Sequence, residues 1–125
     1  MVLTRYKKSQ GKIAMGFLSF MPREQDFAVL QKTIQRYETE PDWQLYLCRE
    51  GNDIIGVIGI EIKKYTFIVH HICVNPSYRN GGVGHLMVEK VQQMHESLAM
   101  CTSSETQEFL AKCWDRQHIL NEYLV

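Results

Sequence analysis

The sequence lacks the features of a nucleic-acid-binding, membrane-spanning or exported protein. Its formal net charge is zero and its basic residues form no stripe, so we do not expect nucleic acid as a partner. No apolar run reaches the roughly 18–20 residues that a membrane span needs, so no membrane association is expected. Because residues 1–12 lack the apolar core of a signal peptide, we expect a cytoplasmic protein.

Cysteine is present, but not in a pattern that binds metal. None of the four cysteines forms a C-x-x-C pair, so neither a zinc site nor a redox motif is predicted. Each lies within or beside an apolar segment, which favours buried free thiols in a reducing compartment. These residues are Cys48, Cys73, Cys101 and Cys113.

The 125 residues are enough for one compact domain, which we expect to span residues 1–125. Apolar spacing predicts strands at residues 2–6, 43–49, 53–63, 66–74 and 98–102. It predicts helices at residues 12–21, 23–37, from 83 onward and at 105–114, whereas the tail fits a short helix or a strand. The strands between residues 43 and 74 should form an antiparallel meander, because their connections are too short for crossovers. The last strand follows a crossover helix and should lie parallel to the 66–74 strand.

Residues 72–86 are the most informative stretch, because a strand ends there, a glycine-rich loop follows and a helix begins. Asn75-Pro76 ends the strand, since proline has no N–H for the ladder. Gly81, Gly82 and Gly84 permit positive φ and close approach of a ligand. The helix that follows offers free N–H groups and the positive end of its dipole. This combination suits a phosphate or pyrophosphate, although the glycines could equally serve only a tight turn.

The spacing of the loop distinguishes among nucleotide-binding motifs. It matches neither the Rossmann pattern Gly-x-Gly-x-x-Gly nor the P-loop pattern. It fits Arg/Gln-x-x-Gly-x-Gly/Ala, the acyl-CoA signature of the GNAT acetyltransferases, with Arg79-Asn80-Gly81-Gly82-Val83-Gly84. The preceding Ile72-x-Val74-x-Pro76 resembles the fourth strand and turn of that family. Up to about Cys113 the chain also resembles the small RibT-type members encoded with riboflavin-synthesis genes, for example at Lys12-Ile13-Ala14-Met15-Gly16.

This resemblance implies an α/β (α+β) fold with a mixed, mostly antiparallel sheet, splayed at the acyl-CoA strand, and helices on both faces. It also implies acetyl-CoA as the cofactor. The backbone of Ile72, Cys73 and Val74 would pair with the pantetheine arm like an added strand. The pyrophosphate would be held by Arg79, Asn80, Gly81, Gly82, Val83, Gly84 and His85, with Ser104, Phe109 and Lys112 beside the pantetheine or adenine end.

The sequence departs from the family where the catalytic groups are expected. Many members carry a tyrosine acid after a phenylalanine in the last helix, but here Leu110 follows the phenylalanine. Some members have a glutamate base in the fourth strand, at the position of Ile68. The remaining candidates for the base are Glu61, His70 and His71, and we expect the two histidines to point to opposite faces of their strand. A hydrogen-bonded packing role is the alternative for each histidine, and simple solvation is the alternative for Glu61.

Two functions fit these observations. The first is an N-acetyltransferase that moves an acetyl group from acetyl-CoA to an unidentified amine of a small molecule or a protein, with a link to riboflavin metabolism through the RibT likeness. The second is a non-catalytic module of the same fold that binds acetyl-CoA or CoA and regulates a partner. The short C-terminus and the missing tyrosine favour the second. A homodimer is a further hypothesis, because a second copy could cover an exposed sheet edge.

Overall fold

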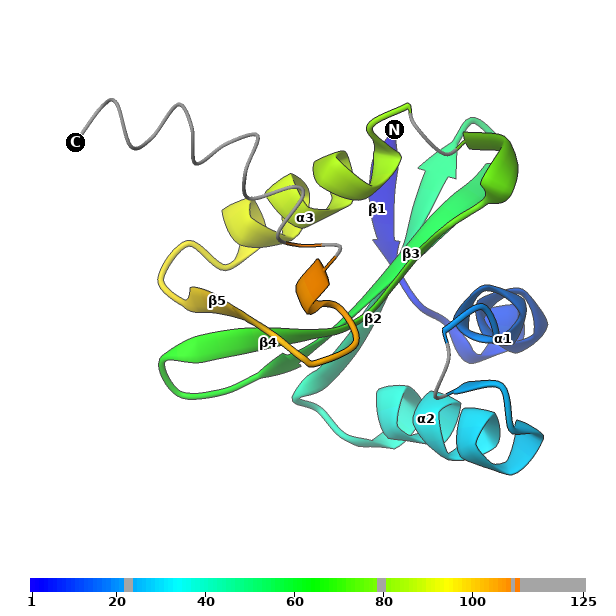
Figure 1. The fold of residues 1–125 in the computed structure, drawn as a ribbon, viewed down its shortest axis with the longest axis horizontal. Coiled ribbons are helices and arrows are strands. Elements are labelled where there is room, and N and C mark those ends of the chain that lie inside the picture. Colours follow the sequence, from blue (N-terminus) through cyan, green and yellow to red (C-terminus); the bar gives the residue numbers. More distant parts are fainter. Residues whose placement is uncertain (22–23, 79–80, 109, 111–125) are drawn as a thin grey trace.

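Five strands form one sheet in the computed structural model, which describes residues 1–21, 24–78, 81–108 and 110. The strands lie side by side in chain order: β1 (Val2–Arg5), β2 (Trp43–Glu50), β3 (Asp53–Ile62), β4 (Thr66–Val74) and β5 (Ala99–Thr102) (Figure 1). The first four pair antiparallel, and β5 pairs parallel with β4. The predicted meander and the parallel last strand are therefore confirmed.

Helices cover both faces of this sheet. α1 (Gly11–Leu18) and α2 (Phe27–Thr39) pack on one face, around Leu18, Leu45 and Val57. α3 (Val83–Met94) packs on the other face (Figure 1), where Met87 and Val91 meet the opposite side chains of β3 and β4. The mixed α/β architecture with a mostly antiparallel sheet agrees with the predicted fold class.

Two helices differ in detail from their predicted positions. α2 begins at Phe27 rather than residue 23, because the Asp26 carboxylate caps it by accepting the Ala28 N–H at 2.8 Å. Phe27, the first residue of α2, is 64% exposed. In α1 the buried face is formed by Ala14 and Leu18, while Ile13 is exposed. The predicted helix 105–114 and the tail after it lie mostly outside the described residues.

A β-bulge in β4 overturns the expectation that His70 and His71 point to opposite faces. The register changes from Gly59↔His71 to Ile60↔Val69, so His70 is an extra residue in β4. Phe67 and Val69 before the bulge and Ile72 after it all face α3. Both histidines instead contact side chains on the α2 side of the sheet, where their ring centroids lie 6.3 Å apart.

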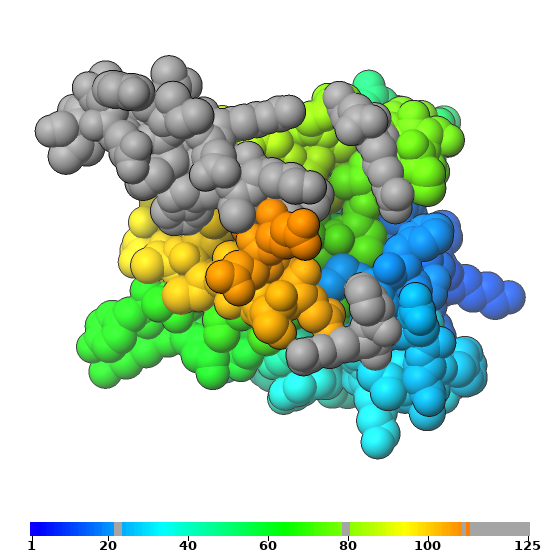
Figure 2. All heavy atoms as spheres, in the orientation of Figure 1, coloured from blue at the N-terminus to red at the C-terminus, as the bar shows by residue number. Residues whose placement is uncertain are grey.

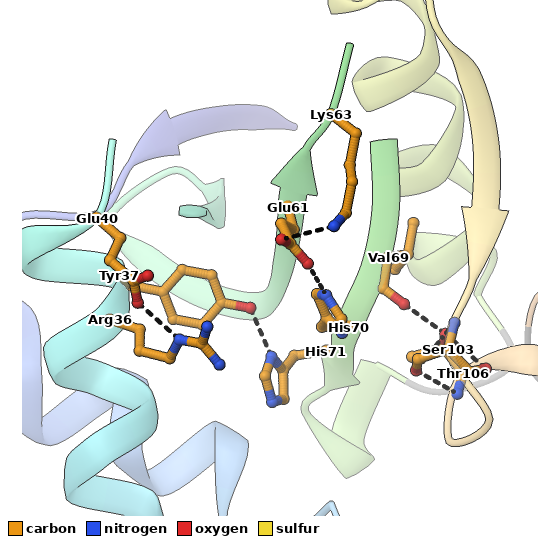
Figure 3. Close-up of polar contacts among 10 residues, drawn as sticks. All are labelled: Arg36, Tyr37, Glu40, Glu61, Lys63, Val69, His70, His71, Ser103 and Thr106. Atoms are coloured by element: carbon orange, nitrogen blue, oxygen red, sulfur yellow. Dashed lines mark hydrogen bonds and ion pairs between the residues drawn. The ribbon is translucent and has the colours of Figure 1, made fainter. Parts of the chain in front are cut away.

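A buried chain of hydrogen bonds ties the segment between α1 and α2 to β4. The Glu24 carboxylate contacts His71 Nε2 at 3.0 Å and accepts the Thr33 hydroxyl at 2.7 Å. The other ring nitrogen of His71, Nδ1, lies 2.5 Å from the Tyr37 hydroxyl (Figure 3). Burial alone would raise the pKa of Glu24, but the hydrogen bonds from His71 and Thr33 outweigh it, so the pKa lies below 4.5. Glu24 is therefore a buried, ionised anchor.

No helix among the described residues is long and apolar enough to cross a membrane. The same residues contain no group of histidine, cysteine and carboxylate side chains arranged to hold a metal ion.

Replacing Glu24 by glutamine should reveal this anchor as a pH-dependent contribution to stability. Because the folded-state pKa lies below 4.5, the carboxylate stabilises the fold above that pH, and this stabilisation is lost as the pH falls through the folded-state pKa. We expect E24Q to unfold more easily at pH 7 by about 1 kcal/mol. Its free energy of unfolding should also fall less steeply below pH 4.5 than that of the wild type.

Urea titrations at a series of pH values measure this difference, with E40Q as the matched control. Glu40 forms only an exposed ion pair with Arg36, so its loss should change stability by less than about 0.5 kcal/mol. Equal pH slopes for E24Q and the wild type would contradict the assignment of Glu24 as an ionised anchor.

Candidate functional site

The candidate site begins where β4 and β5 separate. Their pairing runs from Thr66↔Ala99 to Val69↔Thr102 and extends no further along β4. The Val69 carbonyl then accepts both the Ser103 N–H at 3.3 Å and the Thr106 hydroxyl at 2.6 Å (Figure 3). Residues 70–74 of β4 are therefore left without β5 beside them, as the splayed sheet of the prediction requires.

The backbone groups that face this opening can be identified from the ladder on the other side of β4. The Asn75 N–H donates to the Ile55 carbonyl at 2.8 Å, so the backbone N–H of Asn75 points toward β3. In an antiparallel ladder the direction alternates with each residue, so the N–H and C=O groups of Ile72 and Val74 point away from β3. In the part of the chain that the structure describes, no strand pairs with these groups, so they form an open edge to which an extended ligand could add.

A glycine turn and the start of α3 follow this edge. After a 3₁₀ turn, Pro76–Tyr78, the chain reaches Gly82, which has φ = 81° and precedes the first residue of α3, Val83. This left-handed conformation favours glycine. Among the described residues, no side chain caps α3, and a Cβ added at Gly82 would meet no atom within 4 Å. The turn thus presents a helix N-terminus beside open space, which fits an anionic group such as a pyrophosphate.

The structure places most of the predicted cofactor-binding residues along this path. Ile72, Cys73 and Val74 are buried in β4, so they offer mainly their backbone. Gly81 and Gly82 form the turn, and Val83, Gly84 and His85 form the first turn of α3. Ser104 follows β5 directly. Arg79, Asn80, Phe109 and Lys112 lie outside the described residues.

The space-filling view shows the surroundings of this region. Figure 2 shows the orange residues after β5 beside the blue residues near the end of α1, with green atoms of the middle of the chain visible between them. Segments from three distant parts of the sequence therefore meet on this face.

Of the candidate catalytic residues, His71 is closed off from solvent. Only 6% of its side chain is exposed, and both ring nitrogens have partners, Tyr37 and Glu24. Burial, followed by the nearby Glu24 charge, raises the pKa of Tyr37 well above its ordinary value, so Tyr37 stays protonated. His71 therefore serves as a bridge between α2, the segment after α1, and β4.

His70 and Glu61 form a second, more open pair. His70 Nε2 lies 2.8 Å from Glu61 Oε1, and the second oxygen of Glu61 lies 3.4 Å from Lys63 Nζ (Figure 3). The His70 ring stacks on Trp43 with its centroid 4.5 Å away and an interplanar angle of 8°. Its side chain is 23% exposed, so it can meet both solvent and a ligand.

Two residues of the site were missed by sequence reasoning. Glu24 falls near the start of a predicted amphipathic helix, where a carboxylate is usually solvated, and its partner His71 is 47 residues away. Tyr37 was predicted only as part of an apolar face. No local pattern indicates either contact.

Leu110, which the resemblance places where many family members carry a tyrosine acid, is an apolar side chain in the core. Leu110 is 1% exposed and packs in the cluster on the α3 side of the sheet. A leucine side chain has no proton to donate, so Leu110 supplies no general acid.

Known proteins share both the sequence and the fold. A family model for an acetyltransferase (GNAT) domain matches residues 41–116. An uncharacterized N-acetyltransferase in the lysA 3' region of Bacillus methanolicus is 46% identical over 113 residues, which are 90% of this chain and 94% of that protein.

Solved structures extend this likeness at low sequence identity. A GNAT family acetyltransferase from Elizabethkingia anophelis with acetyl-CoA bound has a TM-score of 0.67 at 16% identity, over 90% of this chain and 73% of that one. The aminoglycoside N-acetyltransferase AAC(6')-Iy in complex with CoA has a TM-score of 0.72 at 13% identity, over 89% and 81% of the two chains. The open β4 edge and the glycine turn agree with these likenesses. The family model and the 46% identical relative show that this chain belongs to the GNAT family of acetyltransferases.

Proposed function

We propose that the protein transfers an acetyl group from acetyl-CoA to an amine acceptor. The observation that carries this proposal is the continuity of the open edge at Ile72 and Val74 with the glycine turn at Gly82. A strand edge suits the amides of a pantetheine arm, and a helix N-terminus suits a pyrophosphate. Acetyl-CoA contains both groups in one extended molecule.

In this proposal the chain binds and orients the thioester. The backbone of residues 72–74 pairs with the pantetheine amides, and Gly81, Gly82 and the first turn of α3 hold the pyrophosphate. The Val74 N–H, which points away from β3, would face the thioester carbonyl, where negative charge develops when the amine attacks. When bound, acetyl-CoA supplies the activated acetyl group. The acceptor amine would approach from the α2 side of β4, where the polar side chains of the site lie.

The acceptor is proposed only by class, as an amine of a small molecule or a protein. The RibT likeness, carried by segments such as residues 12–16, motivates a further proposal that the acceptor belongs to riboflavin metabolism. A cytoplasmic location and a homodimer that covers a sheet edge also remain proposals.

A second function is favoured by one observation, the burial of Leu110 where many family members carry an acid. A protein without that acid could bind acetyl-CoA or CoA and act as a non-catalytic regulatory module. Turnover distinguishes the two functions, because only an enzyme releases free CoA thiol faster when an amine is present.

The proposed transfer predicts amine-dependent thiol release. The protein is mixed with acetyl-CoA and one of three probe amines: spermidine, the aminoglycoside kanamycin, or a lysine-containing peptide. Released thiol is followed with a chromogenic disulfide, and the acetylated amine is detected by mass spectrometry. We expect release that depends on both protein and amine. Binding of acetyl-CoA without release for any amine would instead support the non-catalytic module.

The glycine turn predicts that Gly82→Val weakens acetyl-CoA binding, with Gly51→Val as a matched control. Both glycines have positive φ, 81° and 60°, and open space beside them, but Gly51 lies in the turn between β2 and β3. Each variant should lose at least about 1–2 kcal/mol of stability, because a left-handed residue with a Cβ is strained.

Thermal unfolding with and without acetyl-CoA separates binding from stability. A ligand at 100 times its dissociation constant adds about 2.7 kcal/mol, so the midpoint of the wild type and of G51V should rise by several degrees. That rise should be lost in G82V. A rise of equal size in G82V would show that the loop is only a turn.

A further inference from the structure

We infer that His70 is the general base that accepts a proton from the acceptor amine, and that Glu61 is the positioning residue that orients its ring. This inference rests on the proposed function. It selects one residue from the three candidates that the sequence leaves open, and it follows from the bulge, from burial and from the contacts of each side chain.

The first step is that the other two candidates are less suited to accept a proton from an amine. His71 is closed in, with Tyr37 on one ring nitrogen and Glu24 on the other. Glu61 has both oxygens engaged, one by His70 and one by Lys63. Burial alone would raise the pKa of Glu61, but the hydrogen bonds from His70 and Lys63 outweigh it, so the pKa lies below 4.5 and the carboxylate is ionised at pH 7.

The second step is the location of His70. The pairing of β4 with β5 ends at Val69, so His70 is the first residue of β4 beyond that pairing. It lies two residues before Ile72, where the open edge for the pantetheine arm begins. As the extra residue of the bulge, His70 faces the α2 side instead of the α3 core to which Val69 and Ile72 belong. The bulge thus directs an imidazole to the proposed acceptor side at the point where the sheet opens.

The third step is the orientation of the ring. An ionised carboxylate can only accept hydrogen bonds, so the neutral His70 ring carries its proton on Nε2 and donates it to Glu61 at 2.8 Å (Figure 3). The lone pair is then on Nδ1, and no hydrogen-bond partner for that atom occurs among the described residues. Trp43 fixes the plane of the ring by stacking at 4.5 Å. The imidazole is therefore fixed by the hydrogen bond at Nε2, and its basic lone pair is on Nδ1.

Burial is the main reason that His70 is neutral at pH 7. Burial lowers the pKa of His70 below 6.5, and the neighbouring His71 and the Arg36 guanidinium lower it further. The Glu61 carboxylate opposes this effect, and Lys63 in turn contacts Glu61. A base must be unprotonated to act, and this environment provides that state at physiological pH.

The proton balance of the step is complete without another reagent. An acceptor ammonium gives one proton to Nδ1 of His70 and becomes a neutral amine. The nitrogen lone pair of the amine then forms the C–N bond to the acetyl carbon, the C–S bond breaks, and the second amine proton ends on the CoA sulfur. The proton held by His70 leaves to solvent. The products are the acetylated amine, CoA thiol and one proton.

The ligand-free protein allows a first test by NMR of histidine ring nitrogens. We expect His70 to titrate below 6.5 and to carry its neutral-state proton on Nε2. E61Q should lower that pKa further, because the opposing carboxylate charge is lost. H95Q is the matched control, since His95 is also a half-buried histidine with a lowered pKa, but it ends α3 on the other side of the sheet. A neutral-state proton on Nδ1, or a His70 pKa unchanged by E61Q, would overturn the inference.

Kinetics with the amine that gives thiol release provide the second test. H70Q should lower kcat by about 10²–10⁴-fold and remove the fall in rate at acidic pH, while the thermal shift with acetyl-CoA persists. E61Q should move that fall to lower pH, which a merely structural role would not do. H95Q should match the wild type. If H70Q still releases thiol at the wild-type rate, His70 is not the base, but the proposed acetyl transfer stands. If the wild type releases no thiol, the proposed transfer is contradicted too.

Discussion

The end of the β4–β5 pairing at Val69 is the constraint on which the rest of the site depends. Among the described residues, the pairing with β5 ends at Val69, whose carbonyl accepts the Ser103 N–H at 3.3 Å and the Thr106 hydroxyl at 2.6 Å. Thr106 is fully buried, so its hydroxyl needs a hydrogen-bond partner inside the protein, and the Val69 carbonyl supplies it. Everything proposed for the cofactor follows from this separation, since a continued ladder would occupy the edge at Ile72 and Val74.

The bulge at His70 gives the same strand a second role. A strand without it would place one histidine in the α3 core and one on the α2 side, and only one would be available for chemistry or anchoring. With the extra residue, both histidines lie on the α2 side, where they have different partners. His71 anchors the segment that contains Glu24, and His70 stays partly exposed against Trp43 and Glu61. After the bulge, Ile72 faces α3 again, so β4 continues to contribute apolar side chains to the core on that side.

The fold and the glycine turn could be predicted from sequence because their signals are local. Period-two alternation, Asn75-Pro76 and the glycines at 81 and 82 each act within a few residues, and β4 ends at Val74 and α3 begins at Val83, as these signals predict. The bulge could not be predicted, because it is a register change between β3 and β4 that leaves no mark on composition. The Glu24–His71 contact was missed for a related reason, since it joins residues 47 positions apart.

Amide hydrogen exchange in β4 tests the central claim most directly. In the free protein the N–H groups of Ile72 and Val74 face the open edge, whereas the Asn75 N–H already bonds to Ile55. Saturating acetyl-CoA should slow exchange at Ile72 and Val74 and leave Asn75 nearly unchanged. If acetyl-CoA binds and exchange at Ile72 and Val74 stays as fast as in the free protein, the open edge is not where the pantetheine arm lies.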